Sequence, residues 1–226
     1  MARYTYKNQY SWSADIAYIV GLIASDGCLS KDGRHIDFTS KDLQLAQLFQ
    51  KLIKPGAKIG YKNAGLNNHG VYYRIQFSDS SLYDFLLSTG MTPNKSLIMP
   101  GLKIPKEYFA DFLRGEFDGD GCIYGYKDSR WPNSFMHYTT FTCASLAFLK
   151  WIQDSINTQI SCAGMGTLRK SGGAYQLSYA KKDSLLIFNY MYYDDDVPRL
   201  IRKYQRYLEL FLTNPYAVKE QLADVL

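Results

Sequence analysis

The sequence lacks long apolar runs and closely spaced cysteines. No stretch approaches the roughly 20 apolar residues of a membrane-spanning helix, and the first nine residues have no apolar core of a secretory signal. The four cysteines and three histidines are scattered, without C-x-x-C spacing, which argues against a structural zinc site. We therefore expect reduced thiols in a protein that is neither secreted nor embedded in a membrane, acting in an organelle or a prokaryotic cytoplasm.

A strong excess of charge is missing as well. The formal net charge is +5 and the pI is about 8.8, values compatible with nucleic-acid binding and with many ordinary enzymes. With 46% hydrophobic and 21% charged residues, the 226-residue chain has the composition of a globular protein of one large or two smaller domains. The 20 tyrosines suit half-buried polar surfaces such as interfaces, and they equally suit β-strands.

The chain repeats itself. Residues 18–28 read YIVGLIASDGC and residues 112–122 read FLRGEFDGDGC, and both end in Asp-Gly-Cys. The segments after them correspond too, since 39–82 and 142–185 have equal length and begin and end on matching residues. This agreement indicates an internal duplication, in which each motif opens one half of the molecule.

Each half has the same pattern of periodicity. Segments 34–39 and 71–77 alternate between apolar and polar residues, which predicts strands, and residues 67–70 mark a hairpin turn between strands. Helical spacing puts four apolar residues on one face of the helix after the first hairpin: Leu43, Ala46, Phe49 and Ile53. A second helix carries Leu82, Phe85 and Leu86 in the same way. Each half therefore reads α-β-β-α-β-β-α.

The segment 99–105 contains two prolines and a glycine just before the second motif. We take it as the linker between a first half, residues 1–98, and a second half, residues 106–226. The second half has the longer first hairpin, with an insertion near residues 127–133.

Each motif is built for close helix packing. Glycine and a small residue stand four apart, Gly21 with Ser25 and Gly115 with Gly119, so one face of each helix carries almost no side chain. Two such faces can pack backbone against backbone.

The predicted helices end in an acid followed by glycine. Gly27 and Gly121 suit the left-handed cap that ends many helices. Asp26 and Asp120 would then meet at the helix ends, where the dipole and their mutual repulsion oppose two carboxylates unless a cation is bound. Carboxylates with phosphate oxygens and water form the usual Mg²⁺ environment in phosphoryl transfer.

The two motifs make the sequence resemble the LAGLIDADG homing endonuclease family in its monomeric, two-motif form. The aligned stretches are residues 19–27 and 113–121, and the family's metal-binding acid falls on Asp26 and Asp120. Two positions depart from the family pattern, because Ala24 replaces the usual acid and Glu116 occupies a normally apolar position. Neither removes the essential carboxylate.

The resemblance implies an α+β fold of two pseudo-symmetric halves, each with a four-stranded antiparallel DNA-binding sheet, packed through the motif helices. It implies Mg²⁺, with two or more divalent ions and Mn²⁺ as a substitute, held by Asp26 and Asp120 with the backbone carbonyls of Ser25 and Gly119. It also implies basic and polar residues around the metals, for which the nearest matches are Lys95, Lys203, Lys41 and Ser40.

The family lays its two sheets along the major groove of DNA, and strand alternation selects the side chains that would face it. The predicted DNA-binding residues of the first half are Ser30, Asp32, Arg34, Asp37, Lys58, Lys62, Tyr72, Arg74 and Gln76. Those of the second half are Tyr124, Tyr126, Asp128, Arg130, Arg169, Lys170, Gln176 and Ser178. Because the halves differ at most of these positions, the target should be asymmetric.

The resemblance thus predicts an intron-encoded monomer that cuts both strands of a long DNA site and leaves short 3′ overhangs. Two alternatives remain open: an intron maturase that binds RNA, and a DNA-binding derivative without catalysis. In the second, Asp26 and Asp120 serve only as helix ends.

Overall fold

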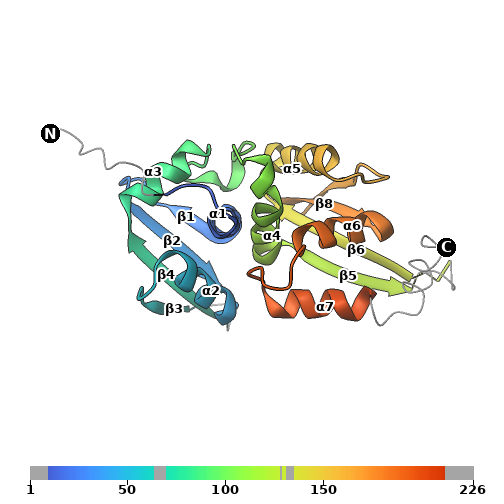
Figure 1. Ribbon diagram of the computed structural model, residues 1–226, viewed down its shortest axis with the longest axis horizontal. Coiled ribbons are helices and arrows are strands. Elements are labelled where there is room, and N and C mark those ends of the chain that lie inside the picture. The colour runs from blue at the N-terminus through green and yellow to red at the C-terminus, as the bar shows by residue number, and fades with distance from the viewer. Residues whose placement is uncertain (1–9, 64–69, 128, 131–134, 212–226) are drawn as a thin grey trace. The chain divides into compact units, whose positions relative to one another are not determined.

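The computed structural model describes residues 10–63, 70–127, 129–130 and 135–211 (Figure 1). The chain forms two compact units, Met1–Gly119 and Asp120–Leu226. Each contains one four-stranded antiparallel sheet, which confirms the predicted α+β class. None of the helices in the described ranges is long and apolar enough to cross a membrane.

The first unit has the predicted order of elements. They are α1 (Ala14–Asp26), β1 (Gly27–Leu29), β2 (His35–Ser40), α2 (Leu43–Ile53), β3 (Ile59–Asn63), β4 (Val71–Ser78) and α3 (Ser80–Ser88), and then the 3₁₀ turns Lys95–Leu97 and Lys106–Tyr108. The sheet order is β1-β2-β4-β3, and α2 lies across β2 and β4 (Figure 1). The core sits between this helix and the sheet, where the rings of Phe38 and Phe49 stack at 4.4 Å.

The helix α2 corrects one predicted face. Its buried residues are Leu45, Ala46, Phe49 and Ile53, whereas Leu43 is 40% exposed. Leu43 is the first residue of the helix, where the chain has only just turned toward the sheet. The predicted face of α3 is confirmed, because Leu82, Phe85 and Leu86 are all buried.

The helix α4 (Phe109–Asp120) contains the second motif and opens the second repeat. The elements after it are β5 (Cys122–Lys127), β6 (Phe135–Cys143), α5 (Leu146–Gln159), β7 (Thr167–Ser171), β8 (Ala174–Ala180), α6 (Lys181–Met191) and α7 (Ile201–Phe211). The sheet order β5-β6-β8-β7 repeats that of the first unit. The strands β5 and β6 are longer than β1 and β2, as the longer hairpin in the sequence predicts.

The second unit has an additional helix after the repeat. α7 packs against β5, and its Tyr207 ring stacks on Phe188 of α6 at 3.5 Å between centroids. Its Phe211 meets His137 of β6 edge to face at 4.1 Å. The helix therefore covers the core side of β5 and β6.

The predicted linker, residues 99–105, contains neither an α-helix nor a strand. Through Gly119, α4 belongs to the first compact unit, so the contact boundary lies at the end of the motif helix while the sequence repeat begins before it. The assignment of the halves by sequence stays a prediction.

Candidate functional site

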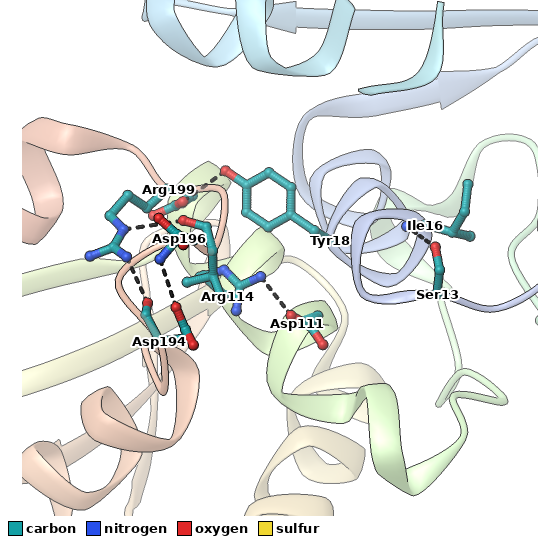
Figure 2. Close-up of polar contacts among 10 residues, drawn as sticks. Ser13, Ile16, Tyr18, Asp111, Arg114, Asp194, Asp196 and Arg199 are labelled. Atoms are coloured by element: carbon teal, nitrogen blue, oxygen red, sulfur yellow. Dashed lines mark hydrogen bonds and ion pairs between the residues drawn. The ribbon is translucent and has the colours of Figure 1, made fainter. Parts of the chain in front are cut away.

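The first motif folds as α1, which begins and ends at defined residues. Ser13 is the N-cap, and its Oγ accepts a hydrogen bond from the backbone N–H of Ile16 at 3.2 Å (Figure 2). At the other end Gly27 has φ −95° and ψ 163°, so the predicted left-handed cap is wrong. The chain passes directly into β1, which requires extended backbone, and Gly121 likewise has no positive φ where α4 leads into β5. Glycine is needed at position 27 for space, since a Cβ there would lie 2.7 Å from the Cα of Ile23.

The two motif helices pack backbone against backbone, as predicted. A Cβ on Gly21 would lie 2.2 Å from the carbonyl oxygen of Phe112, and one on Gly115 would lie 2.1 Å from that of Tyr18. Further along, a Cβ on Gly119 would lie 1.9 Å from Oγ of Ser25. Only glycine permits this approach at all three levels, so the helices run in contact down to the turn that contains Asp26.

A buried polar network, which the sequence did not reveal, accompanies this packing. The hydroxyl of Tyr18 donates to Asp118 at 2.8 Å, and burial followed by the charge of Asp118 raises the pKa of Tyr18 well above its ordinary value. The fully buried guanidinium of Arg114 donates to Asp111 at 2.6 Å and lies over the Tyr18 ring at 5.3 Å (Figure 2). Glu116, which departs from the family pattern, is 1% exposed. The sequence did offer one signal of this network, because α4 carries several charged residues although its glycine spacing predicts a buried helix.

Both predicted lysines are buried near the end of a motif helix. Lys95 is 5% exposed and its Nζ donates to the carbonyl of Ala24 at 2.5 Å. Lys203 is 6% exposed and its Nζ donates to the carbonyl of Gly121 at 2.6 Å. Each lysine comes from the segment after the last helix of its repeat and donates to a carbonyl near the end of the motif helix of that repeat.

Ser40 and Lys41 lie at the end of the first sheet where α1 leads into β1. Gly27 pairs with Phe38, so β2 continues past the start of β1 toward the end of α1. The Oγ of Ser40 accepts a hydrogen bond from the N–H of Asp42 at 3.1 Å, which helps to turn the chain into α2. The ammonium of Lys41 lies 5.3 Å from the centre of the Tyr72 ring.

Each sheet has one face toward its core and one polar face. In the first sheet Ile75 and Phe77 are buried, as predicted, which puts Tyr72, Arg74 and Gln76 on the polar face. Register adds the residues that pair with these: Asp37, Thr39, Gly60 and Lys62. Lys58 precedes β3 and is exposed.

Arg74 and Asp37 form an ion pair on this polar face. Asp37 also accepts a hydrogen bond from Oγ1 of Thr39 at 3.0 Å. The carboxylate therefore orients the guanidinium of Arg74 on this face.

The predicted residues of the first hairpin lie in its turn. Asp32 accepts hydrogen bonds from the backbone of Arg34 at 3.2 Å and of His35 at 3.1 Å, and it pairs with the ring of His35. The His35 contact lowers the pKa of Asp32 to about 2. The backbone carbonyl of Ser30 accepts from the Tyr83 hydroxyl at 2.5 Å. Asp32 thus has a structural role in the turn.

The polar face of the second sheet carries Cys122, Tyr124, Tyr126, Met136, Tyr138, Thr140, Thr142, Thr167, Arg169, Ser171, Ala174, Gln176, Ser178 and Ala180. Arg169 of β7 pairs with Gln176 of β8, so the two side chains lie on the same face of the sheet. Lys170 pairs with Tyr175, so strand alternation points it to the other face from Arg169. Arg130 is exposed beyond β5, and Asp128 lies outside the described residues.

Comparison with known proteins agrees with this geometry. Residues 13–90 match the family model described as the LAGLIDADG-like domain. No sequence among the curated proteins matches the chain.

Solved structures share the fold. The full-length DUF199/WhiA protein from Thermatoga maritima has a TM-score of 0.56 and 16% identity, over 88% of this chain and 61% of that protein. The I-LtrWI LAGLIDADG homing endonuclease bound to target DNA has a TM-score of 0.55 and 14% identity, over 92% and 91%. I-DmoI in complex with DNA and Ca has a TM-score of 0.53 and 14% identity, over 86% and 97%.

Two four-stranded sheets, each preceded by a motif helix that ends in aspartate, define the two-halved LAGLIDADG fold. Residues 13–90 match the LAGLIDADG-like domain and the chain has the fold of solved LAGLIDADG structures, findings that support the resemblance drawn from its two motifs. It spans about 61% of the length of WhiA.

Proposed function

We propose that this protein is a site-specific endonuclease that breaks both strands of a long asymmetric DNA target and leaves short 3′ overhangs. The main support is an arrangement that occurs at the end of both motif helices. In each repeat an aspartate ends the motif helix, and a buried lysine donates to a carbonyl within two residues of it.

The buried lysines favour a catalytic site over a structural one. Moving an ammonium away from water is costly. Lys95 and Lys203 are nonetheless buried beside the ends of the two motif helices. A fixed positive charge there would stabilise the charge that develops on a phosphate during cleavage, or order the attacking water.

The helix ends also fit a hard divalent cation. Asp26 and Asp120 each offer carboxylate oxygens at a helix C-terminus, next in the chain to the backbone carbonyls of Ser25 and Gly119. Within the described ranges no group of three or more His, Cys, Asp or Glu could hold a metal, and Mg²⁺ suits such a sparse set because it keeps waters and phosphate oxygens as ligands. Bound Mg²⁺, or Mn²⁺ in its place, would activate a water and stabilise the leaving oxygen.

Double-stranded DNA is the proposed partner of the two polar faces. Arg74 and Gln76 of the first sheet and Gln176 of the second are types that pair with guanine or adenine in the major groove. The two faces differ in sequence, so a monomer would recognise a target without symmetry. The proposal includes an intron-encoded origin, in an organelle or a prokaryote.

A non-cleaving DNA-binding protein is the second candidate. One observation bears on it: the TM-score of 0.56 to WhiA is close to the 0.55 to the endonuclease I-LtrWI, so the fold alone does not select the endonuclease. An intron maturase would use the same sheets for RNA. The three candidates differ in what they bind and whether they cut.

The deciding experiment is a randomised duplex library incubated with the purified protein, once with Mg²⁺ and once with Ca²⁺, and then sequencing of broken ends and bound fragments. We expect Mg²⁺-dependent breaks at one asymmetric motif, lost in Asp26→Asn and Asp120→Asn. Asp84→Asn, an exposed acid of α3, is the matched control and should cut normally. A motif that is bound and never cut would support the non-cleaving candidate. No bound motif would direct the search to structured intron RNA.

A further inference from the structure

A lysine stands in the apolar face of the helix α7. The buried residues of α7 are Lys203, Tyr207, Leu210 and Phe211, and their spacing puts them on one side of the helix. Lys203 is only 6% exposed, although a lysine at a helix surface normally extends its ammonium into water. The ammonium therefore enters the protein as part of the same face that buries the rings of α7.

Stacked rings hold this face against the rest of the second unit. Tyr207 lies on Phe188 of α6, with ring centroids 3.5 Å apart at 9°, and its hydroxyl donates to Oδ1 of Asn189 at 2.9 Å. One helical turn further on, the ring centroid of Phe211 lies 4.6 Å from that of Tyr207 and 4.1 Å from that of His137 in β6. We call the rings of Phe188, Tyr207 and Phe211 the aromatic clamp.

The start of α7 is fixed as well. The guanidinium of Arg199 lies 4.3 Å from the centre of the Tyr204 ring. It also donates to the backbone carbonyl of Asp194 at 2.7 Å (Figure 2). Lys203 thus lies between two anchors, with Arg199 one helical turn before it and Tyr207 of the aromatic clamp one turn after it.

The acceptor of Lys203 lies next to the proposed metal-binding acid. Nζ of Lys203 donates to the carbonyl of Gly121 at 2.6 Å, and Gly121 directly follows Asp120. A displacement of about 1 Å at a catalytic group can cost roughly a hundredfold in rate. The position of α7 therefore decides whether the charge of Lys203 lies beside the end of the second motif helix.

Lys95 of the first repeat is held in a different way. Its backbone carbonyl accepts hydrogen bonds from the N–H groups of Ile98 at 3.1 Å and of Met99 at 2.8 Å, so a tight turn fixes it. Met99 is 1% exposed and anchors this turn. The three residues of the aromatic clamp all belong to the second unit, whereas Lys95 belongs to the first. A change in the clamp should therefore displace Lys203 and leave Lys95 in place.

We propose that the aromatic clamp positions Lys203 and so controls the second catalytic site separately from the first, an inference that rests on the proposed endonuclease function. Tyr207 is the central positioning residue, because its ring contacts both Phe188 and Phe211. Each repeat carries one set of the proposed catalytic groups, and the target has two strands. Release of α7 should therefore slow the cleavage of one strand more than that of the other.

The test measures the cutting of each strand separately in Mg²⁺, on a duplex of the selected target with a different end label on each strand. Lys203→Met identifies the strand that depends on Lys203, which we expect to be cut roughly a hundredfold more slowly than by the wild type. Tyr207→Ala should slow the same strand by about tenfold or more, and the other strand by less than about twofold. Tyr207→Phe keeps the ring and should restore most of the rate. Arg206→Ala, on the exposed side of α7, is the matched control and should cut both strands normally.

Hydrogen exchange of the same proteins, without DNA or metal, gives a readout besides activity. In Tyr207→Ala the amides of α7 should exchange roughly a hundredfold faster, because a buried aromatic ring is lost, while those of α5 in the same unit exchange as in the wild type. Phe211→Leu is a milder change at the end of the clamp and should act in the same direction. Equal acceleration in α5 and α7 in both variants would make the clamp a general part of the core and overturn the inference.

The cleavage assay separates this inference from the proposed function. An equal loss on both strands, in Lys203→Met or in Tyr207→Ala, would overturn separate control of the second site. Wild-type cutting by Lys203→Met would also overturn it, and the endonuclease itself would stand. A wild-type protein that cuts no duplex would overturn the proposed function and this inference with it.

Discussion

Replacing Gly115 with alanine tests the packing on which the whole site depends. The added Cβ would lie 2.1 Å from the carbonyl oxygen of Tyr18 and 3.0 Å from the backbone nitrogen of Leu22. Ordinary contact begins at 3.4 Å, and the obstacle is backbone, which cannot rotate away as a side chain could. The helices α1 and α4 must therefore part.

The magnitude of the loss depends on this geometry. Separation by roughly 1 Å forfeits up to about half of the dispersion energy of the contacts concerned. Overpacking costs about 1–3 kcal/mol in general, and a rigid backbone obstacle puts this site at the upper end or above. Alanine recovers about 1 kcal/mol of helix propensity relative to glycine. We expect a net loss of about 2 kcal/mol or more.

Thermal unfolding monitored by circular dichroism measures the loss. At about 4 °C per kcal/mol for a unit of this size, Gly115→Ala should lower the Tm of the first unit by about 8 °C. Gly173→Ala is the matched control, because a Cβ there meets nothing within 4 Å, and its Tm should change by less than about 2 °C. Equal Tm values for the two variants would refute backbone packing of the motif helices.

Three further variants test local contacts. Asp32→Asn should lower the Tm at neutral pH. Because the fold lowers the pKa of Asp32 from 3.8 to about 2, the difference in Tm from wild type should shrink between pH 4 and pH 2. A difference in Tm that stays constant over this range would contradict the His35 contact. Ser145→Ala removes the N-cap of α5 and should cost about 1 kcal/mol in urea unfolding, unless the cap bond is absent in solution. Tyr10 donates to Asp79 at 2.9 Å, and burial raises its pKa to about 12, so its stabilisation is complete below pH 10 and lost as pH rises toward 12. The Tm of Tyr10→Phe should therefore be lower than that of wild type at pH 8, and the two Tm values should approach each other above pH 10. Thermal melts at both pH values measure this difference.

Local pattern was enough to predict much of the fold. The repeated motif predicted two halves, and strand alternation placed Ile75 and Phe77 toward the core, because a strand must turn every second residue to the same side. The glycine spacing at 21 and 115 predicted the close approach of the helices, since no other residue type leaves the backbone bare.

The helix caps and the buried face of α2 depend on the elements next to them in the fold. The caps at Gly27 and Gly121 were predicted left-handed from residue type, but the strand that begins at once requires extended backbone. Leu43 is spaced along the helix so that it should share a face with Ala46, but it is exposed. Leu45 is buried instead, because of the direction in which the chain approaches the sheet.

The sequence by itself determined the repeat, the motif helices, the strand faces and the two aspartates, because each is expressed in short-range spacing. Only the tertiary structure decided that Lys95 and Lys203 are both buried near the end of a motif helix, since one lies in a 3₁₀ turn and the other in an additional helix. It also decided that Tyr207 of this helix stacks on Phe188 of α6. Contacts of this kind join residues far apart in the chain, and their partners are set by strand register and helix packing, which no local pattern encodes.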